Sequence, residues 1–196
     1  PEEFELQGSL EQVSNNFNNA GSSMSPFLNT GVMIDSKVYT IKTNPTYKGK
    51  EKPLRDILVD DKDVEEEFYV KNKDLKQWKY LKNSKQEERE TKDGFKYNYS
   101  EGSMVFPDNL AKASRTIITG EGGSGPSRFK HVIAPHSDSR KLRRLTPVEL
   151  ERLNMFPDGH TELENVSNSK RAFLMGNALV VGVIKKLGDS LYKFYE

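Results

Sequence analysis

Short apolar runs separated by polar turn residues dominate the first half of this chain, and they predict small strands. Residues 31–42 predict a β-hairpin, because two β-prone runs flank Asp35 and Ser36, which favour a turn. Aromatic and polar residues alternate over 95–99, a pattern typical of an exposed strand. The pattern therefore predicts small β elements rather than a large sheet.

Helical patterning in this half coincides with dense charge. Residues 74–90 predict a highly charged surface helix, and residues 54–58 predict a single helical turn. The narrow apolar stripe of the longer helix consists of Leu75, Trp78 and Leu81. The stretch Gln7–Ser25 is rich in Asn, Ser and Gly, which favours a loop or linker.

The clearest local signal is the start of a helix at Thr146. A Thr at the N-cap, Pro147 at the first helical position and Glu149 in place for a capping box together predict this start. The helix is expected to run through Leu150 and Leu153 and to stop before the Pro-Asp-Gly sequence at 157–159.

A last helix is expected to begin near Asn177. It carries the apolar residues Leu179, Val180, Val183, Ile184 and Leu187. In one interpretation Asn177 is the N-cap of a buried helix. In the other, Asn177 and the adjoining backbone also face a small-molecule pocket, and local patterning does not separate the two.

Composition limits the chemistry that these 196 residues can perform. With 30 basic and 29 acidic side chains the net charge is +1, which neither demands nor excludes a nucleic-acid partner. The chain has no cysteine, which rules out disulfides, cysteine-bearing zinc sites and a cysteine nucleophile within it. No apolar run approaches a membrane span and no signal pattern opens the chain, so an intracellular fragment is expected.

The glycine-rich loop Gly120–Gly125 matches G-x-G-x-x-G and follows the β-prone run 116–119. A dinucleotide site would need an amphipathic helix directly after the last glycine, and the basic segment 126–131 lacks that pattern. Two interpretations remain. The loop is either a mobile turn or a backbone that approaches DNA, with Arg115, Arg128 and Lys130 near phosphates or guanine edges.

Metal binding is not favoured by the remaining polar residues. Without cysteine or a His-x-x-x-His pair, His131, His136 and His160 are expected to contact solvent or phosphate. The acidic run 60–63 lacks the glycine and the spacing of a calcium loop, so it is expected to be a solvated surface.

Three segments, Ser114–Gly123, Arg144–Asp158 and Phe173–Val180, follow one another in the second half of the chain. In this order they resemble the DNA (cytosine-5)-methyltransferases, in particular bacterial members. Arg144–Asp158 looks like motif IX of that family, and Phe173–Val180 looks like motif X. Ser114–Gly123 resembles the end of the target recognition domain, where a Thr and an aliphatic residue precede a glycine-rich reading loop. The resemblance is firm from about 114 to 184 and looser over 26–106.

The resemblance implies a mixed α/β fold with a defined domain order. Residues 1–25 are expected to form a linker and 26–136 a small, irregular, β-containing target recognition domain. Residues 137–196 are then the motif IX and motif X helices, which complete a Rossmann-like methyltransferase domain. Arg144, Leu150 and Leu153 are expected to be architectural.

The resemblance also assigns candidate site residues, none of them catalytic or metal-binding. Thr116 matches a Thr that packs near the flipped cytosine, and Asn177 and Ala178 match positions that line the S-adenosylmethionine pocket. The expected DNA-binding set is Arg115, Thr116, Gly120, Glu121, Gly122, Gly123, Ser124, Ser127, Arg128 and Lys130. Glu121 is expected either to accept from cytosine N4 or to be solvated, and Arg128 to grip guanine or a phosphate.

The chain departs from the family pattern because motifs I, IV, VI and VIII are missing. In this family a thiolate attacks carbon six of a cytosine rotated out of the duplex, which activates carbon five toward the methyl donor. The chain alone is therefore expected to be inactive. Its expected partners are duplex DNA and a catalytic half that completes the cofactor pocket, in a restriction–modification setting in the bacterial cytoplasm.

Three alternatives remain open at this point. A natural subunit of a split enzyme and a truncated single chain are identical in sequence. A non-catalytic, sequence-specific DNA-binding module could have kept the reading loop and lost the chemistry, although a pure binder has no use for the cofactor-side Gly-Asn pair. An unrelated globular domain with chance motifs is the third.

Overall fold

The computed structural model describes residues 2–18, 27–135, 138 and 140–195. The chain divides into two compact units, an N-terminal unit, Pro1–Lys50, and a C-terminal unit, Glu51–Glu196. This division lies inside the segment expected to be the recognition domain. The expected borders at 25/26 and 136/137, together with His136, lie outside the described residues, so those borders stay predictions.

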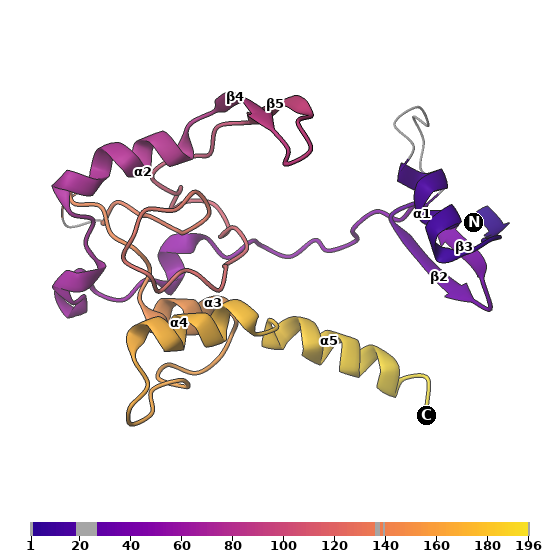
Figure 1. The fold of residues 1–196 in the computed structure, drawn as a ribbon. Coiled ribbons are helices and arrows are strands. Elements are labelled where there is room, and N and C mark those ends of the chain that lie inside the picture. Colours follow the sequence, from indigo (N-terminus) through magenta and orange to yellow (C-terminus); the bar gives the residue numbers. More distant parts are fainter. Residues whose placement is uncertain (1, 19–26, 136–137, 139, 196) are drawn as a thin grey trace. The chain divides into compact units, whose positions relative to one another are not determined.

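The N-terminal unit contains a three-stranded antiparallel sheet in the order β1-β3-β2 (Figure 1). Its strands are β1 (Glu2–Glu5), β2 (Thr30–Ile34) and β3 (Lys37–Ile41). Strands β2 and β3 form a hairpin in which Ile34 lies opposite Lys37. The two turn residues, Asp35 and Ser36, adopt positive φ angles of 48° and 66°, as a tight two-residue hairpin turn requires. The hairpin predicted for residues 31–42 is confirmed.

Helix α1 (Leu10–Asn18) occupies part of the stretch expected to be a loop. Ser9 and Gln12 form a reciprocal pair at its start, with the Ser9 N–H donating to Gln12 Oε1 (2.7 Å) and the Gln12 N–H to Ser9 Oγ (3.3 Å). This is the Ser-x-x-Gln form of a capping box, and it starts the helix. The expectation of a loop over 7–25 is therefore wrong for residues 10–18.

The C-terminal unit begins with short turns rather than long elements. These turns are the 3₁₀ helices η1 (Leu54–Ile57), η2 (Asp61–Asp63), η3 (Glu66–Phe68) and η4 (Asn72–Asp74). The helical turn predicted at 54–58 is thus confirmed as η1. It positions Leu54 and Ile57 in the core, where each is 2% exposed.

The charged helix predicted over 74–90 is only half as long in the structure. Helix α2 (Leu75–Lys82) ends where Asn83 turns to an extended conformation, with φ −74° and ψ 165°. The following segment is strand β4 (Lys85–Glu90), which pairs antiparallel with β5 (Lys96–Glu101). The prediction fails after Lys82 because pairing with the next strand in a β-hairpin outweighs local helix propensity. The strand predicted at 95–99 is confirmed as β5.

Little regular structure lies between β5 and α3 in the residues that are described. The β-prone run 116–119 forms no strand. Ile133 makes an isolated antiparallel bridge with Arg143, and the two residues exchange backbone bonds of 2.8 and 3.0 Å. A few backbone bonds and many side-chain hydrogen bonds together fix this segment, which contains the glycine-rich loop.

Helix α3 (Pro147–Leu153) follows the sequence prediction closely. The Thr146 side chain accepts from the Glu149 N–H (3.3 Å), and Glu149 in turn accepts from the Thr146 N–H (2.7 Å). Leu150 is fully buried, and Leu153 packs against the same core. The architectural role expected for Leu150 and Leu153 is confirmed.

The C-terminal helices are divided differently from the prediction. Helix α4 (Asn168–Asn177) ends at Asn177, and α5 (Val181–Tyr192) begins four residues later. Ala178 between them is extended, with φ −79° and ψ 152°. Asn177 is therefore the last residue of one helix rather than the N-cap of the next, and that prediction is wrong.

The core of the C-terminal unit is formed by residues from distant parts of its sequence. It comprises Leu54, Ile57, Ile133, Leu145, Leu150, Ala172 and Met175. Helices and small antiparallel sheets together make this a mixed α/β chain, as expected. Among the described residues, no helix combines the length and the apolar character needed to cross a membrane.

Candidate nucleic-acid interface

The glycine-rich loop is built around a buried carboxylate. Glu121 is 2% exposed and accepts from the backbone N–H of Ile118 (3.3 Å) and of His131 (3.0 Å). Its Oε1 also lies 2.9 Å from His131 Nδ1. These interactions fold the loop from within. Solvation of Glu121 is thereby excluded, and contact with cytosine N4 would first require these bonds to break.

His131 connects this carboxylate to a third segment. The imidazole has no exposed surface, and its Nε2 lies 3.1 Å from Ser114 Oγ, which also bonds the Arg115 carbonyl (2.8 Å). The Ser-His-Glu order is that of a nucleophilic triad, but the base of such a triad must reach substrate. A fully buried imidazole does not, so the group is structural. The expectation that His131 contacts solvent or phosphate is wrong.

Lys130 holds the opposite side of the loop. Its Nζ donates to the carbonyl oxygens of Gly123 (2.7 Å) and Gly125 (2.8 Å), and the residue is 8% exposed. Burial lowers the pKa of the Lys130 ammonium, and the neighbouring Arg144 lowers it further. In this structure the ammonium positions loop backbone rather than a phosphate.

Arg115 is engaged in the same framework. Its guanidinium forms a bidentate pair with Asp108 (2.7 and 3.2 Å) and donates to the carbonyl oxygens of Phe129 (3.0 Å) and Lys130 (3.3 Å). The planar fork of an arginine suits such a bidentate arrangement. Arg115 therefore fixes the backbone path of 129–130.

Arg128 connects the loop to the base of the β4–β5 hairpin. It donates to the carbonyl oxygens of Leu81 (3.0 Å), Asn83 (3.2 Å) and Gly102, and it lies 3.1 Å from Glu101. Only 13% of its side chain is exposed. A guanidinium with this many internal partners has to release several of them before it can grip guanine.

The remaining candidate residues of the loop are more accessible. Thr116, Gly120 and Ser124 are exposed, whereas Gly122, Gly123 and Ser127 are half-buried. Two exposed residues were missed by the sequence analysis, namely Thr119 and Phe129, whose ring is 53% exposed. An aromatic residue between two basic ones was an available signal for Phe129. We call Thr116, Thr119, Gly120, Ser124 and Phe129 the loop rim.

The dense run of basic residues after Gly125 is mostly interior. Its internally bound members are Arg128, Lys130, Arg143, Arg144 and Arg152. Arg144 is 3% exposed and donates to the carbonyl oxygens of Gly122 (3.1 Å) and Glu67 (2.6 Å), so its expected architectural role is confirmed. Arg140 and Lys141 are exposed. The run is therefore a framework more than a basic face.

Asn177 and Ala178, the expected cofactor contacts, lie at the end of α4. The exposed Asn177 side chain donates from its amide to the Phe173 carbonyl (2.9 Å), and Ala178 is half-buried. Asn154 fixes this end of the helix, because its amide donates to the Met175 carbonyl (2.7 Å). Contact of Asn177 and Ala178 with a cofactor stays a prediction.

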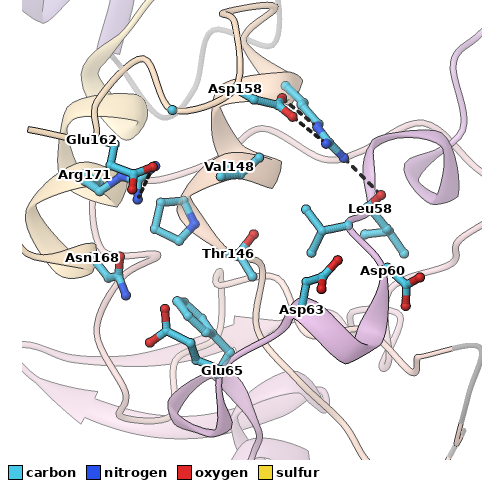
Figure 2. A pocket seen from close by; sticks show the side chains of 15 residues that line it. Leu58, Asp60, Asp63, Glu65, Thr146, Val148, Asp158, Glu162, Asn168 and Arg171 are labelled. Atoms are coloured by element: carbon cyan, nitrogen blue, oxygen red, sulfur yellow. Dashed lines mark hydrogen bonds and ion pairs between the residues drawn. The ribbon is translucent and has the colours of Figure 1, made fainter.

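A separate pocket of about 500 Å³ lies beside α3 (Figure 2). Its acidic lining residues are Asp60, Asp63, Glu65, Asp158 and Glu162. The two arginines in its lining, Arg152 and Arg171, are paired with carboxylates. Phosphate groups are repelled by such a lining, so this face does not suit a DNA backbone.

Histidine and acidic side chains do not gather into a metal site in the part of the chain that the structure describes. His160 stacks on the Phe156 ring, with 4.6 Å between centroids. The acidic run after Asp60 forms η2, in which the Asp60 side chain caps the Lys62 N–H (3.2 Å).

Comparison with known proteins connects these features to one family. The model of the family described as C-5 cytosine-specific DNA methylase matches residues 14–193. The Type II methyltransferase M.Sau3AI of Staphylococcus aureus is 38% identical over 167 residues. That alignment covers 85% of this chain but only 38% of M.Sau3AI, so the chain spans well under half of that relative. No solved structure matches.

The family match extends over both units, and it includes the glycine-rich loop and all three C-terminal helices. The chain belongs to the C-5 cytosine-specific DNA methylase family.

Proposed function

We propose that this chain is the DNA-recognition portion of an S-adenosylmethionine-dependent DNA (cytosine-5)-methyltransferase. Combined with a catalytic part, it would methylate cytosine within a specific duplex sequence. One observation carries the proposal: the family match covers residues 14–193, yet the chain contains no cysteine. Because the chemistry of this family needs a thiolate, the nucleophile has to come from other residues, and this chain alone is inactive.

The loop rim is the proposed DNA-contacting surface. Glu121, Arg128 and Lys130 hold the loop from inside, which leaves the exposed residues Thr116, Gly120 and Ser124 to approach the duplex. A loop held in one conformation before binding loses less entropy when it binds. Internal anchoring therefore supports a reading function, with Glu121, Arg115, Arg128 and Lys130 as positioning residues.

The end of α4 is the proposed cofactor edge. S-adenosylmethionine supplies the methyl group when it is bound. Asn177 and Ala178 contribute an exposed amide and backbone to one side of its pocket, and the catalytic part supplies the rest.

Helix α5 is the proposed contact with the catalytic part. Its exposed apolar residues are Val183, Ile184, Leu187 and Leu191, with 54%, 44%, 56% and 60% of their surfaces accessible. They follow helical spacing, so they form one stripe along the helix. An apolar stripe of this kind is unfavourable in water and typical of a surface that packs against a partner.

The relative's name describes a Type II methyltransferase, and we extend the same restriction–modification setting, in the bacterial cytoplasm, to the protein that contains this chain. A second candidate is a non-catalytic, sequence-specific DNA-binding module, which the absence of cysteine favours.

Methyl transfer distinguishes the two candidates. Labelled S-adenosylmethionine is incubated with mixed-sequence duplex DNA and this chain, alone and together with the catalytic polypeptide or in the full-length protein. We expect transfer only in the completed enzyme, at cytosines within one short sequence. Transfer by the chain alone contradicts the assigned chemistry. Sequence-specific DNA binding without transfer, even when the enzyme is complete, favours the binding module.

A further inference from the structure

The glycine-rich loop and helix α4 are in direct backbone contact. A Cβ at Gly122 would lie 2.7 Å from Ser169 Cα and 2.9 Å from Ala172 Cβ. Carbon atoms in contact are normally about 3.5–4.0 Å apart. Only a glycine therefore allows this part of the loop to lie against the first half of α4.

The second half of the same helix makes an equally close contact, this time through a glycine of the helix itself. A Cβ at Gly176 would lie 2.4 Å from both the N and the Cα of Thr119, and 2.6 Å from the carbonyl carbon of Ile118. These neighbours are backbone atoms, so no rotamer change relieves the overlap. An alanine at this position has to displace the loop or the helix.

Other hydrogen bonds hold both the loop and helix α4 in place at this contact. On the loop side, Glu121 accepts from the Ile118 N–H (3.3 Å), and Arg144 binds the Gly122 carbonyl (3.1 Å). On the helix side, Asn154 binds the Met175 carbonyl (2.7 Å) and accepts from the Val181 N–H (3.0 Å). The loop and the end of α4 are therefore packed as one body.

The loop side of this packed body is proposed to contact DNA, and the α4 side is proposed to contact the cofactor. Thr119 and Gly120 belong to the loop rim, whereas Asn177 and Ala178 directly follow Gly176 at the proposed cofactor edge. We infer that Gly122 and Gly176 are positioning residues that couple DNA binding at the loop to cofactor binding at the end of α4. This inference rests on the proposed function. A displacement at either site is transmitted through two glycine contacts, and binding coupling is reciprocal.

The coupling is measurable in the completed enzyme as a ratio: the Kd for S-adenosylhomocysteine without DNA divided by its Kd with DNA. The Kd for S-adenosylhomocysteine, the product that remains after the cofactor transfers its methyl group, is determined by calorimetry without and with the methylated duplex sequence. We expect the wild-type ratio to exceed one. Gly176→Ala and Gly122→Ala should each lower the ratio by about 3- to 10-fold.

The matched control is Gly125→Ala, in the same loop. A Cβ at Gly125 has no atom within 4 Å, so this variant should keep the wild-type ratio. A variant that merely loses stability regains folded protein when DNA binds, so its ratio should rise rather than fall. Unchanged ratios in both Gly176→Ala and Gly122→Ala overturn the inference, as does an equal loss in Gly125→Ala.

A second measurement needs no variant, in case Gly176→Ala does not fold. Hydrogen–deuterium exchange of the wild-type enzyme should slow on DNA binding at residues 118–123 and also at 173–178. Protection of the loop alone overturns the inference. Methyl transfer by the wild-type enzyme tests the proposed function separately, so an active enzyme with a ratio of one refutes only the coupling.

Discussion

Helices α3 and α5 carry comparably clear apolar patterns, yet their environments in the C-terminal unit differ completely. Leu150 of α3 is fully buried, and Glu149 and Glu151 on the same helix have no exposed surface either. In α5 no residue is buried, and Leu187 is 56% exposed. One helix buries most of its residues within its own unit, whereas the other presents an apolar stripe to solvent.

The two helices therefore have different roles in the C-terminal unit. Helix α3 holds the unit together, because its buried carboxylates fix other segments: Glu149 pairs with Arg143 (2.8 Å) and Glu151 with Arg171 (3.1 Å). Helix α5 contributes little internal packing, and its exposed apolar stripe is the proposed contact with the catalytic part. The predictions below test this separation.

The largest effect is expected from Glu149→Ala in α3. Removal of this carboxylate leaves the Arg143 guanidinium, which is 0% exposed, without its bidentate partner. Arg143 then keeps its longer ion pair with Asp61 (3.7 Å). Breaking a buried ion pair by removing one partner costs about 3–5 kcal/mol. Urea unfolding followed by the fluorescence of Trp78, the sole tryptophan and a residue of this unit, measures the loss.

Asp158→Ala is the control for this measurement. It removes the partner of Arg152 in an ion pair whose carboxylate side chain is 54% exposed. Exposed pairs contribute at most about 1 kcal/mol. Equal losses in the free energy of unfolding for the two variants would mean that a buried ion pair of α3 contributes no more to stability than an exposed one.

The second prediction compares the two helices directly. Leu150→Ala should lower the free energy of unfolding of the isolated chain by about 2–5 kcal/mol, because it leaves a cavity in the core. Leu187→Ala should change it by less than about 0.5 kcal/mol. The same α5 variant should weaken association with the catalytic part, which titration of one with the other measures. If Leu187→Ala greatly lowers the free energy of unfolding of the isolated chain, then α5 contributes to internal packing as α3 does, and the proposed difference between the helices is wrong.

The signals that the sequence reveals are local ones. The start of α3 was predicted because Thr146, Pro147 and Glu149 interact with one another within a single turn. The capping box of Ser9 and Gln12 was equally local, and it was missed because the surrounding Asn and Ser residues suggested a loop.

Other errors arise where segments outside the local sequence decide the outcome. Gly176-Asn177 resembles the start of a helix. In the structure Gly176 lies inside α4, and its lack of a side chain makes room for the backbone of Thr119, which is more than fifty residues away in the sequence. The glycine-rich loop was located correctly, whereas the orientation of Glu121 depends on His131 and that of Arg128 on Gly102. Partners of this kind are not visible in the sequence around either residue.

The third prediction extends the comparison to a buried charge that lacks a carboxylate partner. Lys82 of α2 is 1% exposed and donates to the Lys130 carbonyl. Burial lowers the pKa of Lys82 from 10.5 to about 8. Between these values the unfolded chain binds the proton more tightly than the folded one, so stability should rise with pH. The gain from pH 8 to 10.5 should be about 2–3 kcal/mol.

Paired variants isolate this contribution from other groups that titrate at high pH. Lys82→Met should reduce the rise and leave only the part that comes from Lys130, whose pKa burial also lowers, whereas Lys79→Met, at an exposed position on the same helix, should retain the full rise. Urea unfolding at several pH values between 7 and 11 gives the profiles. A rise in Lys82→Met as large as in the wild-type chain would show that the Lys82 ammonium is not desolvated in the folded chain.

The smallest effect is expected at the junction of the two helices. Met155 directly follows the C-cap of α3 and adopts φ 63°, a left-handed conformation that strains any residue with a Cβ. Met155→Gly should therefore stabilise the unit by about 0.5–1 kcal/mol, net of the greater freedom of glycine in the unfolded chain. Met155→Ala removes the same contact with Gly182 of α5 but keeps the strain, so it should give no gain. If both variants destabilise equally in thermal unfolding, the Met155 contact connects α5 to α3, and the two helices are less independent than their burial indicates.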